Sequence, residues 1–215
     1  VTRDYGQTFT EMNAGIRVST YLGKDNPAIF GNEILSCKGG IYAITGSSAW
    51  ARIPDPEDST KTVYERALYK WNKGKKRFEE IALPAEIAAV RDIEYSEKED
   101  CLYIGAVGST KWLTSEKIGG GLYRYKDSEF TQILDETKFV WGLGLNSQGV
   151  LYAVSFRGEI FRFTENNTKA ELLIGKEDYV GELYHILKDV SFGTDDIIYV
   201  STFGGGMYRI TLKLE

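Results

Sequence analysis

Hydrophobic and polar residues follow one pattern four times along the chain, and the pattern is typical of paired β-strands. One part places an aliphatic residue, an aromatic residue, a basic residue and another apolar residue in that order. Its copies are 68–71, 122–125, 160–163 and 207–210. An upstream companion carries an aliphatic–Tyr pair followed by small or apolar residues, at 41–44, 102–105, 151–154 and 198–201. Repetition of a unit at least two strands deep indicates a repeat fold.

The spacing of the copies fits the blade of a β-propeller. The tyrosines Tyr42, Tyr103, Tyr152 and Tyr199 follow one another at steps of 61, 49 and 47 residues (103−42, 152−103 and 199−152). The first two repeats carry insertions between the two strands, which explains the longer steps. Without the insertions the period falls to the roughly 40–50 residues of one blade.

Each repeat is predicted to contain four strands separated by turn residues. The innermost strands are expected at 32–37, 90–95, 140–145 and 187–192, and the fourth strands at 77–81, 130–134 and 170–174. The last repeat shows no fourth strand. We therefore predict one all-β domain over 1–215, with a leading hairpin and linker at 1–29 and blades at 30–83, 84–135, 136–175 and 176–215. A two-layer sandwich is the alternative, but its strands do not repeat their sequence in register.

The basic residue of each copy is interpreted as structural. Side chains alternate along a strand, so Leu122 and Arg124 share one face while Tyr123 and Tyr125 share the other. Stacked blades bury both faces of a sheet, and a long basic side chain can cover apolar surface while its charged end reaches water.

The segment 2–9, Thr-Arg-Asp-Tyr-Gly-Gln-Thr-Phe, resembles the Asp box, a turn motif of BNR or sialidase-type repeat propellers. It departs from the usual motif in Thr2 for Ser and Phe9 for Trp. The family includes sialidases, xyloglucan-cleaving glycosidases, sortilin-like receptors and non-catalytic assembly factors, so the resemblance implies a fold and no particular reaction. It also implies a structural role for Asp4.

In that family the box follows the third strand of a blade, which would place residues 1–4 at the end of such a strand. Because its partner strands would lie upstream of Val1, we expect four nearly complete blades plus an N-terminal fragment, taken from a larger propeller. The alternative is ring closure, with residues 8–12 as the fourth strand of the last blade. An open arc would need a partner chain or a missing segment to cover its edge strands.

Composition excludes several classes of partner. The net charge is −5 with scattered basic residues, which argues against a nucleic-acid surface. No apolar run is long enough to suggest a membrane span. Cys37 and Cys101 lack the spacing of metal ligands and are expected to be two buried thiols, a disulfide being the alternative.

The site is expected at one end of the channel, where long loops and the starts of the innermost strands meet. The loops 45–67 and 107–119 are long in adjacent repeats. The strand starts align Asn32, Asp92, Gly142 and Asp189. The candidate ligand-binding residues are Trp50, Arg52, Trp112, Trp141, Tyr184 and His185. Trp141 could instead seal the gap between blades.

Asp92 and Asp189 could serve as general acid and base for glycoside cleavage. The alternative is that they accept backbone N–H groups of an adjacent blade. His185 is the sole histidine, which argues against Ser/His/Asp catalysis and multi-histidine metal sites, and no cofactor or metal is expected. The arginines also lack the pattern that a sialidase needs to clasp its substrate.

The sequence therefore favours a non-enzymatic repeat propeller that binds a carbohydrate or a protein through its long-loop face. A glycoside hydrolase, or part of one, is the first alternative. The second is a structural component of an extracellular or viral assembly. The glycosylation motif Asn166-Asn167-Thr168 in a predicted turn favours an extracellular setting.

Overall fold

The protein is all-β, as predicted. The computed structural model describes residues 12–17, 31–45, 52–54, 62–64, 67–87, 89–107, 109–110, 117–118, 120–135, 139–178, 187–193, 196–203 and 205–211. These residues form four main antiparallel sheets and two short ribbons. Within these ranges the one helical element is a 3-10 turn, η1 (Lys176–Asp178).

Each main sheet is a meander in which consecutive strands pair. The first contains β1 (Gly31–Cys37), β2 (Gly40–Thr45), β5 (Ala67–Asn72) and β6 (Arg77–Ile81), and the second β7 (Ala89–Ser96), β8 (Cys101–Val107), β11 (Gly121–Lys126) and β12 (Glu129–Leu134). The third contains β13 (Val140–Leu145), β14 (Leu151–Ser155), β15 (Ile160–Thr164) and β16 (Lys169–Ile174), and the fourth β17 (Leu187–Phe192), β18 (Ile198–Thr202) and β19 (Met207–Ile210). In the fourth sheet the described residues supply three strands, as the sequence predicted.

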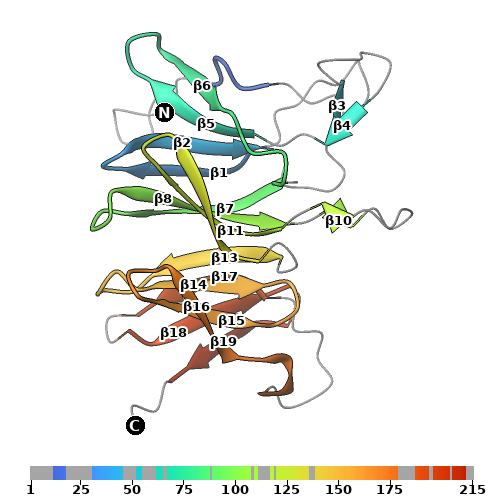
Figure 1. The fold of residues 1–215 in the computed structure, drawn as a ribbon, viewed down its shortest axis with the longest axis vertical. Coiled ribbons are helices and arrows are strands. Elements are labelled where there is room, and N and C mark those ends of the chain that lie inside the picture. Colours follow the sequence, from blue (N-terminus) through green and yellow to red (C-terminus); the bar gives the residue numbers. More distant parts are fainter. Residues whose placement is uncertain are drawn as a thin grey trace, which may run out of the picture.

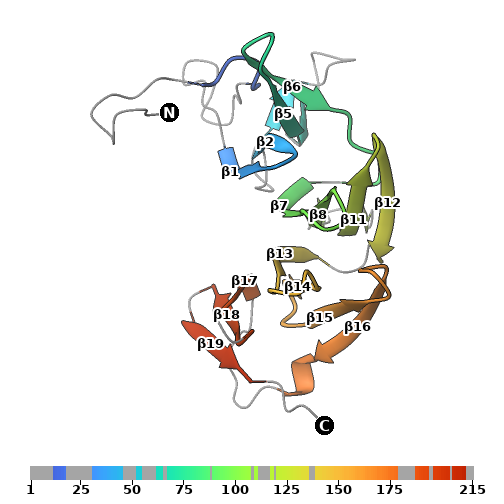
Figure 2. The same ribbon diagram turned by 90° about the vertical axis from the view of Figure 1, so that its left-hand side faces the viewer.

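The sheets stack face to face as the blades of a propeller. Figure 2 shows them following one another around an arc, with β1, β7, β13 and β17 on the inside and β6, β12 and β16 on the outside. The arc is open between the first and last sheets, which fits part of a larger propeller and not the closed ring considered as an alternative.

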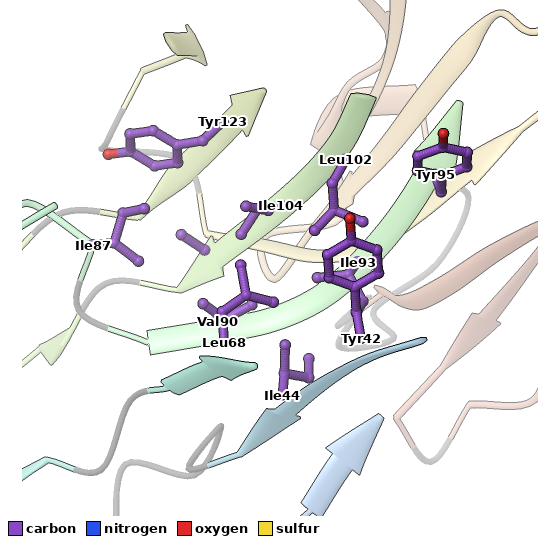
Figure 3. Packing of buried hydrophobic residues seen from close by; sticks show 11 residues of the cluster. Tyr42, Ile44, Leu68, Ile87, Val90, Ile93, Tyr95, Leu102, Ile104 and Tyr123 are labelled. Carbon is purple, nitrogen blue, oxygen red and sulfur yellow. The ribbon is translucent and has the colours of Figure 1, made fainter. Parts of the chain in front are cut away.

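Each inter-blade interface rebuilds the same environment from repeated residues. Tyr42, Tyr103 and Tyr152 on the second strands are all buried, each in the cluster shared with the following sheet. Figure 3 shows the first of these interfaces, where Tyr42, Ile44 and Leu68 meet the strands of the second sheet. Tyr199, the fourth member, is half-buried on the side of the last sheet that no described sheet covers. The predicted likeness of the tyrosine surroundings is therefore confirmed at the three formed interfaces.

The basic residue of each repeat pairs across the strands with the repeated tyrosine. The pairs are Lys70 with Tyr42, Arg124 with Tyr103, Arg162 with Tyr152, and Arg209 with Tyr199. Lys70 Nζ lies 5.2 Å from the centroid of the Tyr42 ring. A cation over an aromatic face is a modest stabilising contact, so Lys70 contributes to the packing of the first sheet.

Residues 12–17 cover part of the outer face of the first sheet. Ile16 packs in a cluster with Tyr69 and Phe78. The backbone N–H of Phe78 donates to the carbonyl of Ala14 at 2.8 Å, and the N–H of Arg17 donates to the Tyr69 hydroxyl at 3.2 Å. The Asp-box segment 2–9 lies outside the described residues, as do residues 8–11 of the predicted closing strand.

Each of the two long loops contains a short antiparallel ribbon that the sequence did not predict. The ribbons are β3 (Arg52–Pro54) with β4 (Thr62–Tyr64), and β9 (Ser109–Thr110) with β10 (Lys117–Ile118). Figure 1 shows β3, β4 and β10 on the same side of the arc. The long loops therefore share one rim of the propeller.

Cys37 and Cys101 are both free thiols. Cys101 is buried on β8, as predicted, whereas Cys37 at the end of β1 is only half-buried. Cys37 lies beside the turn into β2, so its thiol is less covered than a thiol in the middle of a strand would be.

Candidate functional site

A β-bulge lies near the start of the innermost strand in every sheet and sets the direction of the side chains that follow. The pairing shifts between Gly31 and Glu33, Val90 and Asp92, Val140 and Gly142, and Leu187 and Asp189. The residues after the bulge pair with Ile44, Gly105, Val154 and Ser201, which are equivalent members of the second strands. The first-sheet counterpart of Asp92 is therefore Glu33, and the sequence alignment that placed Asn32 there was wrong by one residue.

Asp92 accepts hydrogen bonds from two sheets. Its Oδ2 atom accepts the backbone N–H of Leu143 in the third sheet at 2.6 Å, and its Oδ1 accepts the N–H of Ile93 at 3.0 Å. Glu33 makes the equivalent contact one blade earlier, since its Oε2 accepts the same Ile93 N–H at 3.1 Å. The predicted structural role, bonding to an adjacent blade, is present at Asp92.

The same carboxyl group is held in an environment that favours its protonated form. The pKa of Asp92 lies well above its ordinary value, because burial penalises the charge and because Glu33 shares a hydrogen bond with it and repels it. The Leu143 N–H acts in the opposite direction. Asp92 thus retains its proton more readily than an isolated carboxyl group does.

Glu94 lies two residues further along β7 and shares the face of Asp92. Burial raises its pKa from the ordinary value of 4.5 to about 7, and the negative charges of Glu33 and Asp189 add to the shift. A carboxyl group with a pKa near 7 exchanges its proton at neutral pH, which is the property that general acid–base chemistry requires.

Asp189 occupies the equivalent position on β17 but is more open to solvent. Its Oδ1 accepts the backbone N–H of its neighbour Val190 at 2.8 Å. Partial desolvation raises the pKa of Asp189, while the Val190 N–H and the charge of Lys188 oppose the rise. The structure brings Asp92 and Asp189 to one cavity, yet the carboxyl group hydrogen-bonded to Asp92 is Glu33.

Trp141 lies in the bulge of β13, and its ring contacts Arg91 and Phe156. The guanidinium carbon of Arg91 is 4.6 Å from the centroid of its ring, and the ring of Phe156 packs against it with centroids 5.0 Å apart. Arg91 comes from the second sheet, so this contact seals the boundary between two blades. The structure favours the sealing role over a ring face presented to a sugar.

These residues surround a cavity of about 500 Å³ at the inside of the arc. Side chains of all four main sheets line it: Glu33, Arg91, Asp92, Glu94, Trp141, Leu143, Lys188, Asp189 and Val190. The start of each innermost strand pairs with the end of the next strand, as in Gly31 with Thr45 and Ala89 with Val107. The cavity is therefore near the rim from which the two long loops leave.

The remaining predicted site residues are not placed in this cavity. Trp50, Trp112, Tyr184 and His185 lie outside the described residues, and Arg52 is described only as backbone in β3. Over the parts of the chain that are described, no three His, Cys, Asp or Glu side chains are arranged to hold a metal ion. Within the same ranges, no helix has the length and apolar character needed to cross a membrane.

A second cavity of about 530 Å³ lies toward the opposite rim, lined by turns of the second, third and fourth sheets. Asn167 joins the turns of the second and third sheets. Its side-chain amide donates to Glu99 at 2.5 Å and to the carbonyl of Gly149 at 3.0 Å, and its Oδ1 accepts the N–H of Leu151 at 2.9 Å. Asn167 is buried, so this wall of the second cavity is fixed by packing between blades.

Sequence reasoning missed Glu33, Glu94 and Asn167. Glu33 was missed because it precedes the repeated tyrosine by nine residues (42−33), whereas Gly142 and Asp189 precede theirs by ten (152−142 and 199−189), so the sequence alignment selected Asn32. Glu94 looked like an ordinary outward polar position of an alternating strand. Asn167 was considered only as the middle residue of a glycosylation motif, whose acceptor Asn166 is exposed.

Comparisons with known proteins support the fold at low sequence identity. No family model matches the chain, and no curated protein matches it. The extracellular domain of a proposed one-component system from B. thetaiotaomicron is similar over 88% of this chain and 22% of its own, with a TM-score of 0.60 and 16% identity. A proposed gluconolactonase is similar over 84% of this chain and 60% of its own, with a TM-score of 0.58 and 15% identity.

Virginiamycin B lyase from Staphylococcus aureus is also similar, over 86% of this chain and 56% of its own, with a TM-score of 0.53 and 11% identity. The chain thus spans between about a fifth and three fifths of these proteins. The likeness establishes a β-propeller arrangement of blades and carries no information on chemistry at such identities.

Proposed function

We propose that this propeller binds a partner, either a carbohydrate or a protein, at the channel cavity and the long loops beside it. The observation that carries the proposal is the 500 Å³ cavity, which all four main sheets line and to which the first, second and fourth contribute charged side chains. Ligand sites are typically concave and combine a rigid scaffold with a few convergent polar groups. The two ribbon-bearing loops extend the same rim and give a partner further surface.

The charges of the cavity narrow the chemistry of the partner. Carboxyl groups of Glu33, Asp92, Glu94 and Asp189 accept hydrogen bonds from sugar hydroxyls or from Lys and Arg side chains. Arg91 and Lys188 add positive charges, so the lining of the cavity carries charges of both signs. These features suit a polar or cationic group and disfavour an apolar one.

Binding without catalysis is favoured because both carboxyl oxygens of Asp92 already accept hydrogen bonds from backbone N–H groups. A glycoside hydrolase is the second candidate, and Glu94 is the observation in its favour. With a pKa of about 7, Glu94 can donate a proton at neutral pH while Asp189 acts as the second carboxyl group.

A panel of oligosaccharides and polysaccharides, measured for binding by calorimetry and for cleavage in the same samples, tests the proposal. We expect a bound glycan that is recovered intact, with affinity reduced at least about tenfold by Asp189→Asn. Cleavage that is lost in both Glu94→Gln and Asp189→Asn would assign the enzyme instead. If no glycan binds, the partner is expected to be a protein. The wild-type chain should then capture that protein, and the Asp189→Lys variant should not.

An extracellular location and an N-terminal Asp box are part of the same proposal. The extracellular domain among the similar structures and the exposed Asn166 of the glycosylation motif support an extracellular protein. The sequence resemblance of residues 2–9 supports an Asp box before the first blade. A structural role in an extracellular or viral assembly would require the open faces of the arc to be covered by a partner.

A further inference from the structure

The second cavity, of about 530 Å³, lies among turns of three adjacent sheets, toward the rim opposite the long loops. It is lined by the turn between β7 and β8, the turn between β13 and β14, the turn between β15 and β16, and residues of the fourth sheet. The third sheet, which has a sheet on each side in Figure 2, supplies most of this lining. Cavities of roughly 300–1,000 Å³ are typical of small-molecule sites. The second cavity therefore belongs to the interior of the arc and has the size of a small-ligand site.

Hydrogen bonds between neighbouring turns fix the walls of the cavity. Ser147, in the turn between β13 and β14, donates its backbone N–H at 3.0 Å and its hydroxyl at 2.9 Å to the two carboxylate oxygens of Asp196 in the fourth sheet. On the other side, the amide of Asn167 donates to Glu99 in the second sheet. A site whose walls are fixed beforehand loses less conformational entropy when a ligand binds.

The turn between β15 and β16 has a costly backbone conformation. Glu165, Asn166 and Asn167 have positive φ values of 52°, 57° and 59°. Successive non-glycine residues in the left-handed region cost free energy, and such strain persists where surrounding contacts impose it, often at binding sites. Here those contacts are the hydrogen bonds of buried Asn167 and the N–H of Thr168, which donates to the Thr164 carbonyl at 3.1 Å. The protein thus maintains a strained turn at the wall of the cavity.

The carboxylates that line the cavity already have partners. They are Glu99, Glu165 and Asp196. Glu99 accepts hydrogen bonds from the Tyr103 hydroxyl at 2.9 Å and from Asn167 at 2.5 Å. Glu165 pairs with Lys169 at 3.2 Å, and the third carboxylate is the one bonded to the turn between β13 and β14. A cationic ligand would have to displace these contacts.

Several hydrogen-bond donors of the lining have no partner among the described residues. The stem of Lys98 lies over Gly149, with its Cδ 3.5 Å from a Cβ atom placed there, and within the described chain its ammonium group makes no hydrogen bond or ion pair. Asn146 accepts two backbone N–H groups with its Oδ1, whereas its Nδ2 donates to no described group. Arg162 binds Glu171 through Nη2 at 2.9 Å, and its buried Nε has no partner in the described structure. The unused capacity of the lining is therefore mainly that of donors, two of them on cations.

We propose that the second cavity binds a small polar ligand through an anionic group, a carboxylate or a phosphate, with Lys98 and Arg162 as its cationic contacts. Hydrogen bonds from a cationic donor to an anion are roughly twice as strong as those between neutral groups. Asn146 adds a neutral donor, and the exposed amides of Gln148 and Asn166 can bond hydroxyl groups of the same ligand. This site is separate from the channel cavity, and it does not depend on the function proposed for the channel.

Calorimetric titration of the 215-residue chain with a set of related probes tests the proposal. Glucuronate and glucose 6-phosphate carry the two anionic groups on one sugar frame, inorganic phosphate is the bare anion, and glucose is the neutral control. We expect at least one anion to bind more tightly than glucose, with an affinity that falls as the salt concentration rises. The preferred anion tells whether the site takes a carboxylate or a phosphate. Failure of every anion to bind more tightly than glucose would overturn the proposal.

Substitutions locate the bound anion. Lys98→Gln and Arg162→Gln should each weaken anion binding about tenfold, since each removes one charged donor. Lys38→Gln, in the equivalent turn of the first sheet, and Arg124→Gln, at the equivalent strand position of the second, are matched controls that lie outside the lining. Circular dichroism verifies folding, and the exposed Lys98 carries the test alone if the Arg162 variant does not fold. Anion affinity that is unchanged in Lys98→Gln, or that falls equally in the controls, would also contradict the proposed site.

Discussion

The backbone N–H of Leu143 lies 2.6 Å from Oδ2 of Asp92, so a carboxyl group of one blade holds the innermost strand of the next. This contact links the architecture to the cavity, because the same Asp92 lines the candidate site. A substitution at Asp92 therefore changes both the stability of the arc and the chemistry of the channel.

The acceptor role of Asp92 is separable from its charge. Asp92→Asn keeps an oxygen for the Leu143 N–H, whereas Asp92→Ala leaves a buried donor without a partner. We expect the Ala variant to be less stable than the Asn variant by about 1–3 kcal/mol. Both variants lack the carboxyl charge, so urea unfolding of the pair isolates the hydrogen bond. Equal free energies of unfolding would contradict the role.

Gly142 allows β13 and β17 to approach closely. A Cβ atom there would lie 2.5 Å from the Cα of Asp189 and 2.8 Å from the carbonyl oxygen of Lys188. Gly142→Ala is expected to reduce the free energy of unfolding by about 1–3 kcal/mol, because two strand backbones must move apart. Gly74→Ala serves as the control, since the nearest atom to its Cβ is a side-chain oxygen at 3.4 Å. Similar melting temperatures for both variants would refute this explanation.

Glu94 makes stability depend on pH. Its pKa is about 7 in the folded chain and near 4.5 when unfolded, so the folded state binds more protons between these values. The free energy of unfolding should therefore fall as the pH rises from about 4.5 to 7 and level off above it. Glu94→Gln should flatten this part of the profile and stabilise the protein at pH 8 by on the order of 2 kcal/mol. An unchanged pH profile would show that Glu94 is not the group responsible.

Asn167 and Asn166 form a matched pair for a hydrogen-bond test. Both have positive φ, 59° and 57°, so replacement by Ala causes comparable backbone strain. Asn167 is buried with three hydrogen-bond partners, whereas Asn166 is exposed. We expect Asn167→Ala to lose about 1–3 kcal/mol more than Asn166→Ala. Thermal melts of the two variants measure the difference, and a difference near zero would remove Asn167 from the inter-blade link.

The strands could be predicted from sequence because each blade rebuilds the environment of the one before. The expected fourth strand at 77–81 coincides with β6, and the expected innermost strand at 140–145 coincides with β13. Alternation and the repeated Tyr–basic pairing were sufficient, since both depend on contacts that recur.

The candidate site was predicted less completely, for two physical reasons. The spacing between the bulge and the repeated tyrosine differs between sheets, from nine residues in the first (42−33) to ten in the third (152−142), so counting along the sequence selected Asn32 where the structure places Glu33. The raised pKa of Glu94 arises from burial and from charges on β1 and β17, which are distant in sequence. Such properties belong to the assembled channel, and no local pattern encodes them.

The glycines of β13 also determine the polarity of the channel. Gly142 and Gly144 stand in the positions that Asp92 and Glu94 occupy on β7, so the third blade contributes no carboxyl group where its neighbour contributes two. A cationic group in the channel would find carboxyl partners on the first, second and fourth blades and none on the third. Its hydrogen bonds would therefore be made to one side of the third blade or the other, which would fix its orientation.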